Sequence, residues 1–299
     1  MDQILAYLQN LTVMVTRLAD VALPFQHPHL VVNALLDGSI GLLLKLWFGF
    51  ILSTTDLETG RAFTENVTIQ RFEPVVRLVS NAGLGLVVVW ASYRLMWGQG
   101  AMSKYTVRLM LPRLLMGAVL INLALPLFQM FVEASNAACQ AIQSFGTVPH
   151  DWGAWWRQYT LDQTAGVWQV VTTALLIVGY DVLGVAFVIR YTILIVLAIT
   201  APLAGLLFIL PDTNHLATKW ASFFVTNLFM QPAQLFVLAI GFALENGGHS
   251  PFHHLFALAA LLVVFKVPGA LHSTRQVAHK LESAVVTSAK FVGRAVVRA

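Results

Sequence analysis

Two ionisable side chains lie in the most apolar part of the chain and are the first candidates for chemistry. Asp181 is the only formal charge between Val167 and Ile189, and Arg190 follows directly after that run. Charged groups at membrane depth are costly, so they usually face protein or water, and they often serve a proton or ion pathway. A structural ion pair between Asp181 and Arg190, formed across a turn between two helices, fits the same pattern and is the interpretation we favour.

Three amide side chains form a second candidate group. Asn227, Gln231 and Gln234 fall on one helical face at steps of four and three, with Pro232 between the two glutamines. Amides of this kind hydrogen-bond across membrane helices, with contributions of roughly 0.6 to 2 kcal/mol each. The pattern predicts packing of helices or subunits, and its sharper alternative is the polar lining of an aqueous path.

Prolines interrupt the run from Tyr191 to Leu210. Pro202 lies in its middle and Pro211 follows its end, while Ala201 and Gly205 stand one turn apart. A proline frees a backbone carbonyl, and in lipid that carbonyl must find a partner inside the protein. Small residues favour close helix packing. We therefore expect this segment at the centre of a bundle.

No enzymatic motif is present in the sequence. It contains no glycine-rich phosphate loop, serine elbow, paired cysteines or His-Glu-x-x-His spacing. His249, His253 and His254 follow Glu245 closely enough for a metal pair, but they lie in a Gly-Gly-His-Ser-Pro segment typical of a solvated loop. We expect no catalytic residue, no cofactor and no metal.

The composition explains why these polar residues must be considered in a membrane. Of the 299 residues, 58% are hydrophobic and only 11% are charged, against roughly 45 to 50% and 25% in soluble domains. A soluble fold could not bury so much apolar surface. The net charge of +4 comes from basic residues at the ends of apolar runs, as the positive-inside rule expects.

The apolar runs predict an all-α polytopic membrane bundle of five to six spans, covering residues 74 to 271. The expected spans are Val75 to Tyr93, Leu109 to Val132, Val167 to Ile189, Tyr191 to Leu210, Ala217 to Leu244 and, as a short sixth, Leu255 to Leu271. Two of these spans follow one another almost without a loop and meet near Arg190.

The two ends of the chain predict amphipathic interfacial helices that flank the bundle. Residues 1 to 73 contain an amphipathic helix over the first twenty residues, an interrupted apolar stretch from Leu30 to Leu52, and a polar stretch from Ser53 to Glu73 that we expect to be a solvent loop. Residues 272 to 299 form a basic amphipathic tail suited to anionic headgroups.

Charge and aromatic residues predict the orientation. Arg94, Lys104, Arg108 and Arg113 mark the first connection as cytoplasmic, so residues Glu133 to Gly166 should face the other side. There Trp152, Trp155 and Trp156 suit an interfacial anchor, or alternatively a recognition surface for a partner or substrate. Five full crossings would put the basic tail outside, so one late segment, first of all Leu255 to Leu271, should not cross fully.

The central residues resemble the core of TrbL-like conjugal-transfer proteins, the polytopic inner-membrane components of type IV secretion systems. The resemblance covers roughly residues 75 to 271. Leu111-Pro112-Arg113-Leu114 shares it, and its main motifs are Arg190, Ala201-Pro202-Leu203-Ala204, Leu210-Pro211-Asp212-Thr213, Trp220, Gln231 and Gln234.

This resemblance implies a non-enzymatic scaffold or channel component in the bacterial inner membrane. Such a protein would form homo-oligomers and contact other secretion subunits. It would support the translocation of DNA or protein and the assembly of a pilus or stalk, and separate ATPases would supply the energy. A small-solute transporter or ion channel built on Asp181 and Arg190 is the rival hypothesis. Such proteins often contain internal repeats, but the Ala-Pro-Leu-Ala pattern has no second copy in the sequence. A membrane anchor without any conduit is the third hypothesis.

Overall fold

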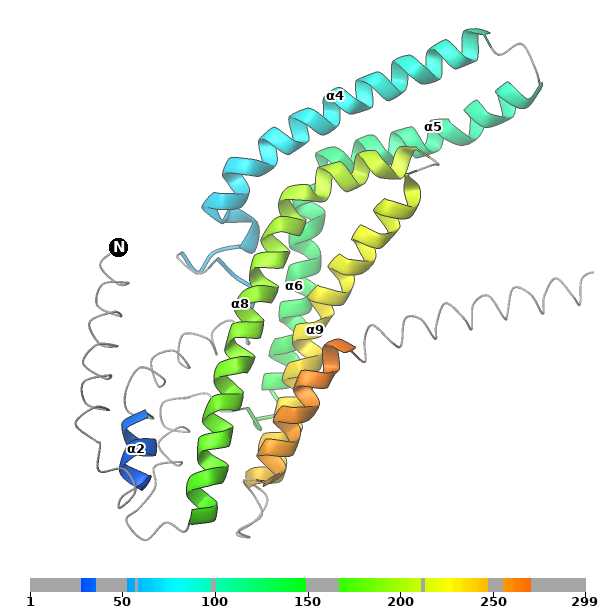
Figure 1. The fold of residues 1–299 in the computed structure, drawn as a ribbon. Coiled ribbons are helices and arrows are strands. Elements are labelled where there is room, and N and C mark those ends of the chain that lie inside the picture. The colour runs from blue at the N-terminus through cyan, green and yellow to red at the C-terminus, as the bar shows by residue number, and fades with distance from the viewer. Residues whose placement is uncertain are drawn as a thin grey trace, which may run out of the picture.

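The regular structure of the described part of the chain is entirely helical, which confirms the predicted all-α class. A computed structural model describes residues 28–35, 53–56, 59–97, 101–148, 167–210, 213–246 and 255–269 (Figure 1). The helices are α2 (Pro28–Leu35), the 3-10 turn η2 (Phe63–Glu65), α4 (Val67–Trp97), α5 (Ala101–Asn122), α6 (Ala124–Gln143), α8 (Val167–Ile209), α9 (Asn214–Asn246) and the unlabelled helix Leu255–Gly269.

Helix α8 is the axis around which the other helices pack. It runs unbroken for 43 residues, about 64 Å at 1.5 Å per residue and roughly twice the hydrocarbon thickness of a bilayer. The predicted division into two spans at Arg190 is therefore wrong. The residues on either side of Arg190 include no glycine or proline, and arginine is itself a good helix former. Helices α2, α4, α5, α6 and α9 all contact α8 (Figure 1).

The predicted span from Leu109 to Val132 is not one straight helix. It breaks at Leu123, where α5 and α6 meet at a bend of 71°. Pro126 stands in the first turn of α6, has no N–H to donate to the Asn122 carbonyl, and sterically opposes a continuous helix there. The Asn122 side chain also donates to its own helix, at the Ala118 carbonyl (2.9 Å).

Among the described residues, three helices are long and apolar enough to cross a membrane, and four if the bent pair counts as one span. This is fewer than the five to six spans predicted. One span is lost because α8 is continuous. The helix Leu255–Gly269 is only about 22 Å long, which agrees with the expectation that this segment does not cross fully.

The stretch expected to be a solvent loop is partly built into the fold. Thr54, Asp56, Phe63 and Glu73 are all buried, and α4 begins at Val67, so the expected boundary at residue 73 falls inside a helix. The stretch was misjudged because its polar residues have protein partners. The Asp56 carboxylate, for example, accepts hydrogen bonds from Asn66 Nδ2 (2.7 Å) and Thr59 Oγ1 (2.5 Å).

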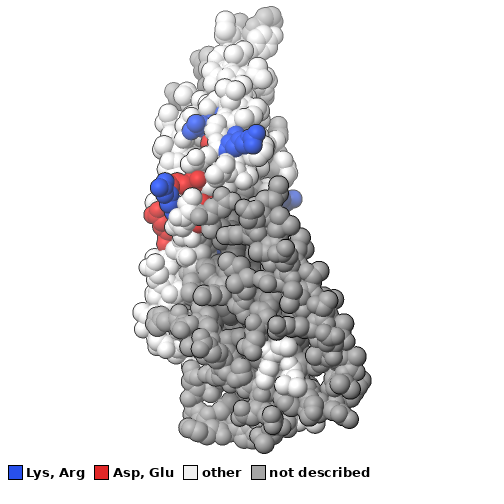
Figure 2. Space-filling view, turned by 90° about the vertical axis from the view of Figure 1, so that its left-hand side faces the viewer, with Lys and Arg blue, Asp and Glu red and all other residues white. Residues whose placement is uncertain are grey.

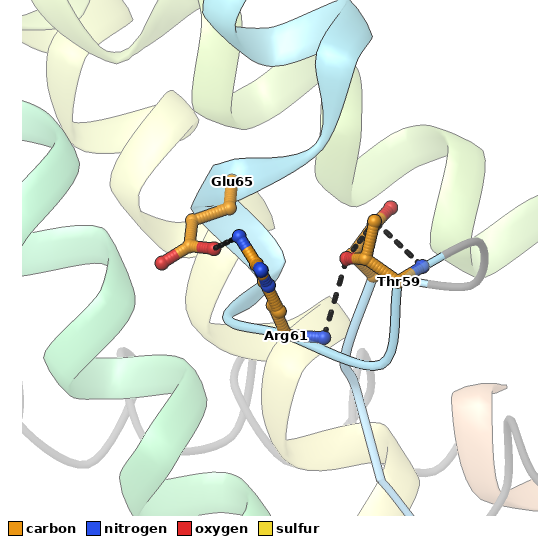
Figure 3. Close-up of polar contacts among 4 residues, drawn as sticks. Thr59, Arg61 and Glu65 are labelled. Atoms are coloured by element: carbon orange, nitrogen blue, oxygen red, sulfur yellow. Dashed lines mark hydrogen bonds and ion pairs between the residues drawn. The ribbon is translucent and has the colours of Figure 1, made fainter.

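A tight turn places this segment against the bundle. Gly60 adopts a positive φ of 68°, a conformation that costs other residues free energy, and the Arg61 carbonyl accepts a hydrogen bond from Asp56 N (3.0 Å). Thr59, Arg61 and Glu65 lie on the outer side of the turn, where Arg61 and Glu65 form an exposed ion pair at 4.0 Å (Figure 3).

The hydrophobic core follows α8 as three successive clusters. The first contains Leu183 and Phe187 with Leu235 of α9. The second begins one turn later with Tyr191 and includes Phe63, whose ring meets that of Tyr191 edge to face at 5.4 Å. The third surrounds Ile209 near the end of α8. Arg190 therefore lies between the first and second clusters.

The outer surface suits an apolar environment. Leu78, Leu86 and Met96 on α4 are each more than 70% exposed. The charged atoms on the face in Figure 2 gather in one stretch of the described surface. Arg61 and Glu65, which precede α4, and Arg71 near the start of α4 are exposed. Because Phe63 packs on Tyr191, these charges lie level with the middle of α8.

Several sequence predictions lie outside the described residues. These are the amphipathic helix over residues 1–20, the basic tail 272–299, the tryptophans Trp152, Trp155 and Trp156, the histidine segment 249–254, and Pro211.

Candidate functional site

Arg190 is the centre of a buried polar layer. Its side chain comes from α8, and the residue is 3% exposed. Its Nε donates to the Asn227 carbonyl at 2.7 Å, and its Nη2 donates to Thr54 Oγ1 at 3.4 Å and to the Leu228 carbonyl at 3.5 Å. These are neutral oxygens, and hydrogen bonds to them offset part of the cost of burying the guanidinium.

Pro232 explains why a donor is needed at the Leu228 carbonyl. In a regular helix that carbonyl would accept from the N–H of residue 232, which proline lacks. Ser135 Oγ of α6 donates to the Leu228 carbonyl at 3.1 Å, and Arg190 reaches it from α8. The group that the proline frees is thus satisfied by two neighbouring helices, as the membrane interior requires.

Thr54 joins the segment 53–56 to three helices. Its backbone N–H donates to Asn136 Oδ1 (2.7 Å) and its carbonyl accepts from Asn136 Nδ2 (3.1 Å). Its hydroxyl bonds Gln231 Oε1 (2.6 Å) and accepts from Arg190. Residues of α6, α8 and α9 therefore all bind Thr54, which is 2% exposed.

Gln234 repeats the same chemistry at a second proline. Its Nε2 donates at 3.4 Å to the carbonyl of Val264 in the helix Leu255–Gly269. That carbonyl is four residues before Pro268, so it too lacks its regular backbone donor. Gln231 and Gln234 are both buried, and each of them connects α9 to another element.

Asn227 contributes differently from the two glutamines. Its side-chain Nδ2 donates to the Phe223 carbonyl of its own helix at 2.8 Å, and its backbone carbonyl accepts from Arg190. The prediction of a shared amide face is therefore only partly realised as interhelical bonds.

Trp220 connects α9 to α8 next to Pro202. Its Nε1 donates to Thr200 Oγ1 at 3.1 Å, and the Thr200 hydroxyl donates to the Val196 carbonyl at 2.9 Å. The indole also stacks on Phe224 with ring centroids 5.7 Å apart. Pro202 is buried inside α8.

Asp181 does not join the polar layer. It lies on the same continuous helix as Arg190, nine residues away, which places it about 13.5 Å along the axis and on the opposite side. Because no turn separates the two residues, the predicted pairing across a turn is wrong. Asp181 Oδ1 is buried without a hydrogen bond within the described part of the chain.

Sequence reasoning found some members of this layer and missed others. Arg190, Asn227 and Gln231 stood out because they interrupt apolar runs. Ser135 and Asn136 carry the same signal, because they are polar residues within α6, a mostly apolar helix. Thr54 gave none, because its role depends on Asn136, 82 residues away.

Comparison with protein-family models, curated proteins and solved structures gives no match for this chain. The class that the fold defines is a helical membrane protein, with three to four candidate spans in the part of the chain that the structure describes. In the described residues no group of three or more potential metal ligands is present.

Within the described residues, the arrangement holds helices together and keeps its polar side chains away from the surface. Arg190, Asn227, Gln231 and Gln234 are all less than 10% exposed. Their hydrogen-bond partners include protein oxygens on α9, the segment 53–56 and the helix Leu255–Gly269. The layer therefore acts as a set of crosslinks among membrane helices.

Proposed function

We propose that this chain is a non-enzymatic membrane scaffold of the TrbL-like class in a type IV secretion machine of the bacterial inner membrane. The observation that carries the proposal is the polar layer, in which Arg190 bonds the proline-interrupted backbone of α9 and the segment 53–56. Such a layer fixes the relative positions of long helices without leaving a reactive group exposed.

The residues that carry the family resemblance support this reading. Arg190, Trp220, Gln231 and Gln234 each join two different elements of the fold. Residues selected for transport chemistry would instead be expected to face a cavity or water. Their shared role in packing suits a protein whose task is to hold a defined shape within a larger assembly.

In this proposal any translocation path for DNA or protein forms between copies of the chain. The polar groups of the layer around Arg190 are hydrogen-bonded inside each copy, whereas the exposed apolar side chains of α4 offer surface to lipid and to neighbouring subunits. Contacts with the membrane, other secretion subunits or a stalk subunit would be made by the predicted amphipathic helices at residues 1–20 and 272–299 and by the segment with Trp152, Trp155 and Trp156. Separate ATPases would supply the energy.

Genetic deletion tests the assignment. A donor strain lacking the gene should lose conjugative transfer while its ordinary solute uptake is unchanged, and the wild-type gene should restore transfer. Complementation with Arg190→Met should fail, whereas Arg61→Met, which changes an exposed ion pair, should restore transfer. Undiminished transfer after deletion would refute the proposal.

One observation favours the rival transporter hypothesis. Asp181 Oδ1 is buried in α8 without a hydrogen bond within the described residues, as a carboxylate in a proton or ion relay could be. A flux of solute or ions through proteoliposomes that is present with the wild-type chain and absent with Asp181→Asn would support a transporter. We expect no such flux from the wild-type chain.

A further inference from the structure

The bend between α5 and α6 leaves an apolar cavity against α8 and α9. Its volume is about 370 Å³, within the range of small-molecule sites. Much of its wall is formed by small residues, and Phe128, Phe224 and Trp220 add aromatic surface. The small residues are Ala124, Ala201, Ala204, Gly205, Ala217 and Ala221.

The polar groups of the lining side chains are already occupied. The Thr218 hydroxyl donates to the Asn214 carbonyl at 3.0 Å, and Trp220 Nε1 donates to Thr200 at 3.1 Å. A buried water needs two to four polar partners, which these side chains do not offer. The lining therefore matches hydrocarbon rather than water or a polar ligand.

The cavity cannot close by a closer approach of α5 and α8. A Cβ added to Gly205, which lines the cavity, would lie 3.1 Å from the backbone nitrogen of Ile121, so α8 and α5 are already in contact there. Unfilled space of this kind loses packing energy. The walls belong to α8, α9 and the bent pair, all candidate membrane elements, so lipid acyl chains surround them.

A basic side chain lies two helical turns from the lining of the cavity. Arg113 of α5 stands seven residues before Leu120, which lines the cavity. Seven residues are two helical turns, so Arg113 lies on the same face about 10 Å from Leu120. It is exposed, lies near the middle of α5, and belongs to the basic stretch from Arg94 to Arg113 that the positive-inside rule assigns to the cytoplasmic side.

We propose that this cavity binds one acyl chain of an anionic phospholipid whose phosphate is bound by Arg113. The lipid would fill the angle between α5 and α6 and hold the bend against α8 and α9. This inference does not depend on the function proposed above, because it rests on the cavity, the occupied polar groups and the position of Arg113.

Native mass spectrometry of the full chain in mild detergent tests the proposal. Wild-type protein should retain phosphatidylglycerol in preference to phosphatidylcholine. Ala221→Phe should abolish retention by filling the cavity, whereas Ala82→Phe on the exposed side of α4 should not change it. Arg113→Gln should weaken phosphatidylglycerol retention about fivefold, the equivalent of the ~1 kcal/mol that one basic residue contributes near an anionic surface, and leave phosphatidylcholine unaffected.

Tryptophan quenching gives a second measurement that does not require a bulky substitution. Equimolar phosphatidylglycerol with brominated chains, added in detergent, should quench the part of the fluorescence that is lost in Trp220→Phe. Equal lipid retention by wild type and Ala221→Phe, or no Trp220 quenching, would overturn the proposal. A disulfide between two copies of a Thr218→Cys, Cys139→Ser chain would also overturn the proposal, because a second subunit would then occupy the cavity.

Discussion

Proline and side-chain donors act together at the residue scale. Pro232 frees the Leu228 carbonyl, and Ser135 and Arg190 donate to it. Pro268 frees the Val264 carbonyl, and Gln234 donates to it. Each of these two prolines therefore creates an acceptor inside an apolar bundle, and each acceptor is met by a donor from a different helix. The helix-breaking residues thereby become points of specific helix pairing.

The role of Arg190 predicts a clear loss of stability. Arg190→Met should lower the free energy of unfolding by about 1 to 3 kcal/mol, because it removes the buried hydrogen bonds of the guanidinium to the Asn227 carbonyl, the Leu228 carbonyl and the Thr54 hydroxyl. Arg61→Met should change it by less than about 0.5 kcal/mol, because that side chain is 75% exposed. Denaturation of the purified protein in detergent micelles measures both values. A variant Arg190→Met as stable as wild type would contradict this account of the layer.

The pairing of proline and donor predicts a coupling between two substitutions. Ser135→Ala should destabilise the wild-type chain by about 1 kcal/mol. In a Pro232→Ala chain it should have almost no effect, because residue 232 then supplies a backbone N–H to Leu228. A double-mutant cycle measures this coupling. Equal effects of Ser135→Ala in the two backgrounds would show that the hydroxyl does not serve the carbonyl that the proline frees.

At the element scale, close contacts position the helices around α8 and α9. A Cβ added to Gly241 of α9 would lie 2.5 Å from the Cβ of Ala260, which is fixed to its own backbone. The two helices can approach only because residue 241 is glycine, a device common in membrane bundles. In contrast, nothing lies within 4 Å of a Cβ added to Gly85 of α4.

These two glycines form a matched pair for a packing test. Gly241→Ala should destabilise the protein by about 1 to 3 kcal/mol through overpacking. Gly85→Ala should stabilise it by roughly 0.5 to 1 kcal/mol through its higher helix propensity. Melting temperatures in the same detergent give the two signs. Two shifts of the same sign would show that the contact with Ala260 does not limit the approach of the helices.

The sequence predicted elements better than their connections. Composition and periodicity are local properties, so the helical class and the amide positions of α9 could be found. The continuity of α8 could not, because a charged residue after an apolar run indicates the end of a span, whereas the charge of Arg190 is hydrogen-bonded inside the bundle. Pro126 is a sequence signal for the bend between α5 and α6. Contacts such as Thr54 with Asn136 depend on packing between distant segments.

At the scale of the whole molecule, the length of α8 exceeds what one bilayer can cover. Exposed charges near Arg61 and Glu65 lie level with the middle of α8 because Phe63 packs on Tyr191. Hydrocarbon cannot surround α8 on both sides of these charges at that face. Apolar surface that extends beyond the bilayer must be buried against other protein, and contacts between copies in the proposed assembly would bury it.

This surplus of apolar surface predicts association of the chain with itself. Light scattering of the purified protein, corrected for detergent, should give a mass of two or more times 32.9 kDa. A stable monomer at all concentrations would contradict the proposed oligomer.

The central claim is that the polar layer packs helices and does not line a passage. Thiol labelling tests it most directly, because the chain has one cysteine, Cys139, and it is buried. In a Cys139→Ser chain, Gln231→Cys should stay unreactive toward a charged thiol reagent in intact membranes opened to both sides, while Arg61→Cys reacts readily. Labelling of Gln231→Cys as fast as that of Arg61→Cys would mean that water reaches the layer, and would contradict the account.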